Sequence, residues 1–180
     1  MNVTKFPVVI FASPRTGSTA LGHHIHNQYP ELKYFIEPNF SNTEMEDYLE
    51  YSKSNNNYIV KLMASFNIYY PRTILSNDVF KIKISRRNVV EQIASFYVAR
   101  QKDIWDYNQV NYNDSKDIVI ELSEVRKCIF MVMDERNILD RITTDIELFY
   151  EDFAEFNSPT NITPKPSNYP LLLDTISKLI

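Results

Sequence analysis

Residues 8–21, VVIFASPRTGSTAL, constrain the fold of this chain more than any other segment. The apolar run from Val8 to Phe11 predicts a buried parallel strand, and the pattern that begins at Ala20 predicts a helix shortly after it. A tight turn between a strand and a helix presents backbone N–H groups and the positive end of the helix dipole to an anion. Gly17 lets a ligand approach the backbone closely. Neighbouring residues add side-chain donors: Arg15, Thr16, Ser18 and Thr19. The segment therefore predicts a cradle for a phosphate or sulfate group.

Two positions distinguish this loop from the G-x-x-x-x-G-K-[ST] loop of nucleoside triphosphatases. Ala12 stands in place of the first Gly, and Ser18 stands in place of the Lys that contacts the β- and γ-phosphates. The cation comes earlier, as Arg15, and a fork-shaped guanidinium suits an oxyanion without a bound metal better than a magnesium nucleotide. The alternative is a turn that binds nothing, and the crowding of Arg, Gly and hydroxyl residues argues against it.

A second segment, residues 79–105, repeats the strand-to-helix pattern with the sequence VFKIKISRRNVVEQIASFYVARQKDIW. Its apolar alternation predicts a strand that ends near Ser85, and a helix that begins near Asn88. Arg87 lies at the strand end, and Ser95 lies two turns into the helix. Both side chains are therefore expected to converge on one anion at the carboxyl edge of the sheet. The alternative makes Arg87 a solvated residue and Ser95 a residue of the helix surface.

Together these segments resemble sulfotransferases that use 3′-phosphoadenosine 5′-phosphosulfate (PAPS). The family's 5′-phosphosulfate loop, P-[KR]-[ST]-G-[ST]-[ST], is matched by PRTGST, and its Arg-x7-Ser motif for the 3′-phosphate is matched by Arg87 and Ser95. The local form RRN-xxx-Q-xx-S is most similar to the bacterial, glycolipid-modifying branch, and other features are similar to the tyrosylprotein branch. Residues 146–153, IELFYEDF, resemble a Y-E-D-[LF] segment of the family. We expect Glu151 and Asp152 to cap a helix or hold a loop rather than to act in catalysis.

The resemblance implies an α/β fold, a three-layer sandwich with a mainly parallel central sheet of the P-loop-like sulfotransferase type. It implies transfer of a sulfuryl group from PAPS to a hydroxyl of a carbohydrate, glycolipid or other small acceptor, with 3′-phosphoadenosine 5′-phosphate (PAP) as product and no metal. The implied donor-binding residues are Arg15, Thr16, Gly17, Ser18, Thr19, Arg87 and Ser95.

The implied catalytic residues are Glu37, Arg15 and Lys61. Glu37, in FIEPNF, matches the position of the base in the bacterial and tyrosylprotein enzymes, and the alternative makes it a surface acid at a strand end. Lys61 is expected to stabilise charge. The family's C-terminal G-x-x-G-x-W-K segment is absent, and Lys165 or Ser167 is a candidate to replace it.

Composition adds limits to this interpretation. The 180 residues predict a single compact domain spanning 1–180, and a net charge of −4 argues against general affinity for nucleic acid. The lone Cys128 excludes an internal disulfide and a cysteine metal cage. The absence of a long apolar run, and an N-terminus that leads directly into a strand, predict a cytoplasmic protein without stable membrane insertion. The short chain leaves little room for acceptor-binding insertions, so we expect an acceptor site that is either open or completed by a second copy of the chain in a homodimer.

The remaining pattern alternates strands and helices. Strands are expected at 33–36, 58–63 and from 146. Helices are expected at 43–53, from an N-cap at Ser123 to 141, and at 171–179. Residues 103–117 are expected to form a mobile loop over the site. Three functions remain open: an active sulfotransferase, a nucleotide kinase or triphosphatase on a related fold, and a non-catalytic protein that binds PAP or a partner.

Overall fold

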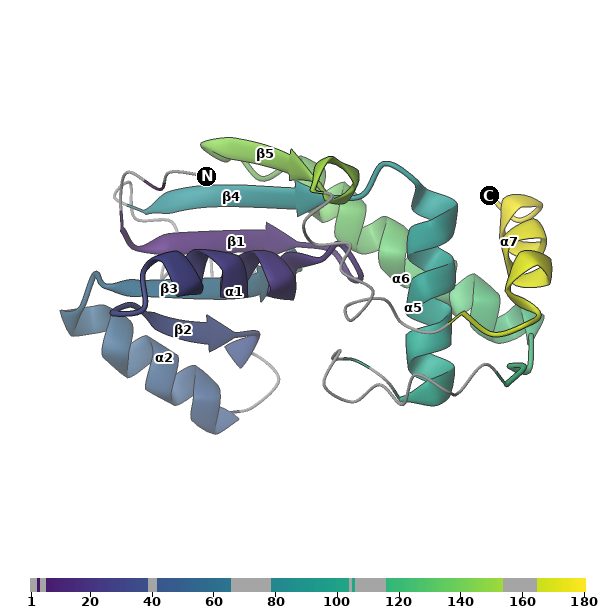
Figure 1. Cartoon of the computed structure of the whole chain (residues 1–180), viewed down its shortest axis with the longest axis horizontal. Coiled ribbons are helices and arrows are strands. Elements are labelled where there is room, and N and C mark those ends of the chain that lie inside the picture. The colour runs from purple at the N-terminus through teal and green to yellow at the C-terminus, as the bar shows by residue number, and fades with distance from the viewer. Residues whose placement is uncertain are drawn as a thin grey trace.

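Five parallel strands form one sheet in the order β2-β3-β1-β4-β5 (Figure 1). The computed structural model describes residues 3, 6–38, 42–65, 79–103, 105, 116–153 and 165–180. The strands are β1 (Val8–Ala12), β2 (Lys33–Ile36), β3 (Tyr58–Met63), β4 (Phe80–Ser85) and β5 (Ile146–Phe149). Every residue of β1 is buried because this strand has neighbours on both sides and helices over both faces. The predicted parallel α/β architecture is confirmed.

The helices are α1 (Ser18–Gln28), α2 (Asn42–Ser54), α5 (Val89–Lys102), α6 (Leu122–Asp140) and α7 (Tyr169–Ser177), and one 3₁₀ turn, η3, spans Tyr150–Asp152. Their positions confirm the predicted helices, and α2 begins within one residue of its predicted start, whereas three other starting points differ. Helix α1 begins before Ala20 because Gly17 takes the N-cap position. Glu121 is the N-cap of α6, so the prediction of Ser123 was wrong. Helix α7 includes Pro170 in its first turn, where no N–H is needed for the helix.

Three hydrophobic clusters hold the layers together. Helix α1 packs on one face of the sheet through Leu21 and Ile25. Helix α2 packs on the other face through Met45 and Tyr48, together with the end of α6 at Leu139. Helices α5, α6 and α7 share a separate cluster, and Figure 1 shows α5 and α7 beyond the carboxyl ends of the strands. The carboxyl edge of the sheet is therefore faced by a helical wall.

The order of the strands defines a switch point. The chain leaves β1 towards β2 and leaves β4 towards β5, so the connections diverge between two neighbouring strands. In open parallel sheets, ligands bind outside the carboxyl ends of the strands at this place. Both segments that the sequence assigns to anion binding follow these strands.

Most of the loop predicted at 103–117 falls outside the described ranges. In the ranges that the structure describes, no helix is long and apolar enough to cross a membrane.

Helix α1 lies close to β2 at Gly22. A Cβ atom on this glycine would overlap Oη and Cζ of Tyr34, whose ring also packs edge-on against His23. Gly22 is therefore needed for the close approach of the helix and the Tyr34 ring.

We expect Gly22→Ala to lower the free energy of unfolding by about 1–3 kcal/mol, because the added methyl group overpacks this contact. Chemical denaturation measures the change. The same substitution in a Tyr34→Leu background should cost much less, since the overlapping ring atoms are gone. An equal cost in both backgrounds would show that the ring is not the reason for the glycine.

Candidate functional site

The loop after β1 has a backbone conformation that suits an anion. The φ angle is +62° at Arg15 and +75° at Gly17, whereas Thr16 between them has no positive φ. When left-handed and ordinary backbone conformations alternate, successive N–H groups point towards one concave side. Such an arrangement, called a nest, binds anions. The buried Thr16 hydroxyl donates to the carbonyl of Ser13 (3.0 Å) and so holds the turn. Helix α1 follows directly, and its N-cap residue, Gly17, has no side chain with which to cap the first N–H groups.

Gly17 is also a contact point for the turn η3. A Cβ at this position would lie 2.7 Å from Cδ2 of Tyr150, so the ring packs directly on the glycine. Ser18 is buried and Thr19 half-buried in the first turn of α1. The predicted cradle residues thus form one continuous turn, and Tyr150 is a neighbour that the sequence analysis missed.

Arg15 extends from the cradle to helix α5. Its Nε donates to Oγ of Ser95 at 3.1 Å, and its Nη1 donates to the carbonyl of Trp105 at 3.3 Å. Burial, and then the charge of nearby Arg86, lower the pKa of Arg15 below its ordinary value. The structure therefore brings Ser95 to the cradle arginine.

Arg87 lies elsewhere. Its guanidinium forms a bidentate pair with Asp152 at 2.5 and 2.7 Å and lies over the ring of Phe149. The expected convergence of Arg87 and Ser95 is not seen in this arrangement, since Ser95 contacts Arg15 instead. The reason is topological: β5 neighbours β4, so the turn after β5 brings a carboxylate to the end of β4.

The other acid of the YED segment caps helix α5. Glu151 accepts hydrogen bonds from the backbone N–H groups of Arg87 (3.0 Å) and Asn88 (3.1 Å). Although burial acts to raise the pKa of Glu151, these hydrogen bonds lower it overall. Asn88 adds a cap of its own by accepting from the N–H of Glu91. The structural role predicted for Glu151 and Asp152 is confirmed.

Glu37, which follows β2, forms an ion pair with Lys61 of β3. The backbone N–H of Glu37 donates to the carbonyl of Lys61 (2.9 Å), which continues the pairing of the strands past Ile36. Glu37 has a φ angle of +47°, which is uncommon for a residue with a side chain. Backbone strain of this kind concentrates at functional sites.

The Lys61 side chain is only 6% exposed. Burial, and then the charge of Arg15, lower the pKa of Lys61 to about 7, while the carboxylate of Glu135 acts in the opposite direction. The influence of Arg15 means that the predicted catalytic residues, Arg15, Lys61 and Glu37, lie in one electrostatic cluster.

A buried polar network lies behind the cradle, and the sequence-based predictions did not include it. The amide of Gln92 donates to Oγ of Ser13 (2.8 Å) and to the carbonyl of Pro14 (2.6 Å), and its oxygen accepts from Arg136 (2.8 Å). Arg136 also donates to the carbonyl of Arg86. A glutamine within the apolar stripe of a predicted helix was the available signal, because buried polar groups need partners.

The two residues proposed to replace the C-terminal G-x-x-G-x-W-K segment of the sulfotransferases have different partners in the structure. Lys165 lies 3.5 Å from the carboxylate of Glu91 and over the ring of Tyr169, at the start of helix α5. Ser167 instead donates to Asp117. Lys165 therefore shares the carboxylate of Glu91 with Arg86.

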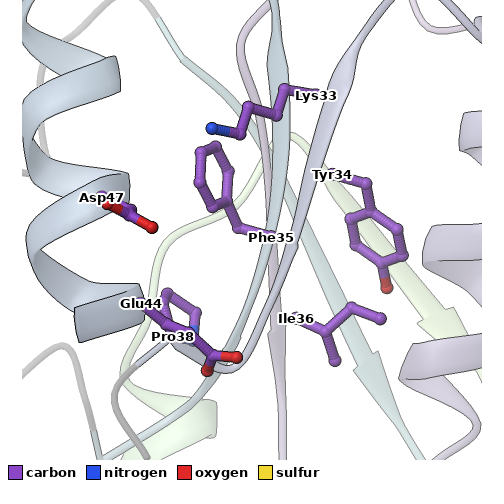
Figure 2. A pocket seen from close by; sticks show the side chains of 7 residues that line it. All are labelled: Lys33, Tyr34, Phe35, Ile36, Pro38, Glu44 and Asp47. Atoms are coloured by element: carbon purple, nitrogen blue, oxygen red, sulfur yellow. The ribbon is translucent and has the colours of Figure 1, made fainter. Parts of the chain in front are cut away.

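A pocket of about 330 Å³ lies along the free edge of β2. Figure 2 shows Phe35 and Pro38 on the side of α2, which contributes Glu44 and Asp47, whereas Ile36 points to the other side of the strand. Ile36 and Pro38 are the sequence neighbours of Glu37. The pocket therefore adjoins the strand end that carries the predicted base.

The histidines of α1 are used in packing and local contacts. The rings of His23 and His26 pack against Tyr34, and His24 contacts Gln28. Within the described ranges, no group of three or more His, Cys, Asp or Glu side chains is placed to hold a metal ion.

The lowered pKa of Lys61 predicts a pH-dependent contribution to stability. The folded protein releases this proton near pH 7, whereas an unfolded lysine holds it to about pH 10.4. Between these values the unfolded state binds more protons, so the free energy of unfolding should rise with pH. We expect it to rise in the wild type relative to Lys61→Met between pH 7 and about pH 9.5, as measured by urea denaturation. A constant difference between the two proteins would contradict the lowered pKa.

No protein-family model matches this chain, and the comparison with curated proteins found no significant match. The fold and the geometry of the site therefore carry the functional argument.

Proposed function

We propose that this protein is a PAPS-dependent sulfotransferase with the three-layer, P-loop-like sulfotransferase fold, and that it transfers a sulfuryl group to a hydroxyl of a carbohydrate, glycolipid or other small acceptor. The observation that carries the proposal is the backbone nest at 15–17, which follows the central strand and holds Arg15 against Ser95. This conformation favours an oxyanion at the switch point of a parallel sheet.

A second observation supports the assignment of the base. Among the described residues other than glycine, φ is positive only at Arg15, Glu37 and Asp103. Asp103 is the C-cap of helix α5, where a left-handed residue is common. The other two are residues to which the resemblance to sulfotransferases assigns donor binding and catalysis.

The reaction assigns a role to each catalytic residue. The acceptor oxygen forms a bond to sulfur while its proton passes to the carboxylate of Glu37. The bond between sulfur and the bridging oxygen breaks, and its electron pair remains on the 5′-phosphate of PAP. Arg15 and the loop N–H groups stabilise the charge on that phosphate, and Lys61 holds Glu37 in place and adds positive charge.

Binding of the 3′-phosphate at Arg87 requires an exchange. The phosphate replaces the carboxylate of Asp152, whose pair with Arg87 is exposed to solvent. An exposed ion pair contributes about 0–1 kcal/mol, so a phosphate dianion can displace it at little cost.

The pocket along β2 supports the choice of acceptor class. It adjoins Glu37, and its polar groups include the carboxylates of Glu44 and Asp47. Carboxylates accept hydrogen bonds from hydroxyl groups and repel anions, and the ammonium of Lys33, which lies over the ring of the buried Phe35, can donate a hydrogen bond to a hydroxyl. These features favour a neutral, hydroxyl-rich acceptor such as a sugar.

We expect PAP to bind with micromolar affinity in the absence of magnesium, because the cradle supplies its own cations. Titration calorimetry of PAP without magnesium, and of ATP with magnesium, measures this. Binding of ATP with magnesium but not of PAP would contradict the proposal and favour a kinase or triphosphatase.

We expect Glu37→Gln to lower kcat by roughly 10²–10⁴-fold, because the acceptor hydroxyl then lacks a general base. The affinity for PAP should stay within about twofold of the wild type, since Glu37 contacts Lys61 rather than the cradle. Formation of sulfated product from labelled PAPS and a panel of neutral sugars reports the rate. Unchanged turnover would exclude Glu37 as the base. A wild type that binds PAP and sulfates no hydroxyl acceptor would favour the non-catalytic alternative.

A further inference from the structure

Two adjacent arginines follow β4, and the structure places them differently. The side chain of Arg87 is 52% exposed and is paired with Asp152. The side chain of Arg86 is only 16% exposed. The sequence motif points to Arg87, whereas burial within the site points to Arg86.

Arg86 lies beside the anion cradle. Its guanidinium carbon is 4.8 Å from the centroid of the Tyr150 ring, and this ring packs on Gly17 of the cradle. The positive charge of Arg86 also acts directly on Arg15. Two guanidinium groups, one after each of two neighbouring strands, therefore lie close together at the switch point.

The carboxylates near Arg86 are held mainly by other groups. Glu91 and Glu151 each lie 3.8 Å from the Arg86 guanidinium, beyond hydrogen-bond distance. Glu91 accepts a closer hydrogen bond from the hydroxyl of Tyr169 (2.8 Å), and Glu151 accepts from the backbone at the start of α5.

The Nε atom of Arg86 is buried and has no hydrogen-bond partner among the described residues. A buried donor without a partner is costly, and two neighbouring guanidinium groups repel each other. A single anion between Arg15 and Arg86 would remove both penalties.

We propose that Arg86 binds the 5′-phosphate group of the nucleotide together with Arg15, so that the cradle anion is shared by two arginines from neighbouring strands. This inference rests on the proposed function, because that function supplies the nucleotide. It adds a binding residue that the sequence motif does not identify, and it leaves the 3′-phosphate to Arg87.

The test compares PAP with adenosine 5′-monophosphate, which lacks the 3′-phosphate. Arg86→Gln should lower the affinity for both ligands by the same factor, about tenfold or more, because a charge-assisted hydrogen bond to the 5′-phosphate that they share is lost. Arg87→Gln should weaken PAP alone. Arg141→Gln is the matched control, since this exposed arginine is the C-cap of α6, ahead of the amino end of β5. Calorimetry measures PAP, and NMR titration measures the weaker monophosphate.

Two outcomes would overturn the inference. If Arg86→Gln weakens the binding of PAP and leaves the binding of the monophosphate unchanged, Arg86 contacts the 3′-phosphate. Arg86→Gln that behaves like Arg141→Gln would remove Arg86 from the site. Thermal denaturation checks that each variant is folded. If Arg86→Gln does not fold, Arg86→Lys, which keeps the charge, is tested in its place.

The wild-type protein offers a second measurement. The NMR signal of the Arg86 Nε–H should shift when PAP is added, because this donor gains an acceptor. If the wild type binds neither nucleotide, the proposed function fails, and titration with inorganic sulfate then tests the inference alone. A shift of the Arg86 signal with sulfate would support the two-arginine anion site, and an unchanged signal would contradict it.

Discussion

The position of the anion cradle depends on the buried side chain of Gln92. This one amide holds Ser13 and Pro14 at the end of β1, and it is itself held by Arg136 of α6. Its side chain is fully buried, so every one of these bonds replaces a contact with water. A buried polar group left without its partner costs about 1–3 kcal/mol. Through this network, helices α5 and α6 fix the loop whose backbone conformation favours an anion, and they fix Ser95 beside Arg15.

Positively charged side chains lie together at the carboxyl edge of the sheet, although the chain as a whole is acidic. Arg15 follows β1, Arg86 follows β4, and Lys61 lies in the second half of β3, which pairs with β1; the three cations differ in their partners. Lys61 is matched by Glu37, whereas Arg86 has carboxylates near it without a hydrogen bond to them. Like charges at short distance in a partly buried site raise the affinity for an anion, because the anion relieves their repulsion. Burial is the main reason why the pKa values of Arg15 and Lys61 are lowered, and a neighbouring like charge adds to it in each case.

The sequence predicted the sheet well because its strands are apolar and β-branched, and 58–63 is an example whose limits agree with β3. Helix starts were less predictable, since a cap depends on three-dimensional neighbours as well as on residue type. The pairing of Arg87 with Asp152 joins residues 65 positions apart, and no local pattern indicates it. The strained backbone of Glu37 and the buried position of Arg86 are likewise consequences of packing. The motif matches two strand-to-helix turns that follow neighbouring strands, but it did not determine which side chains meet there.

A crystal structure with PAP would test the central claim most directly. The account predicts the 5′-phosphate within hydrogen-bond distance of the backbone N–H groups of 16–19 and of the Arg15 guanidinium. It also predicts that the acceptor pocket along β2 stays open beside Glu37. A nucleotide bound in that pocket or elsewhere, with no phosphate in the cradle, would contradict the assignment of the loop after β1 as the donor site.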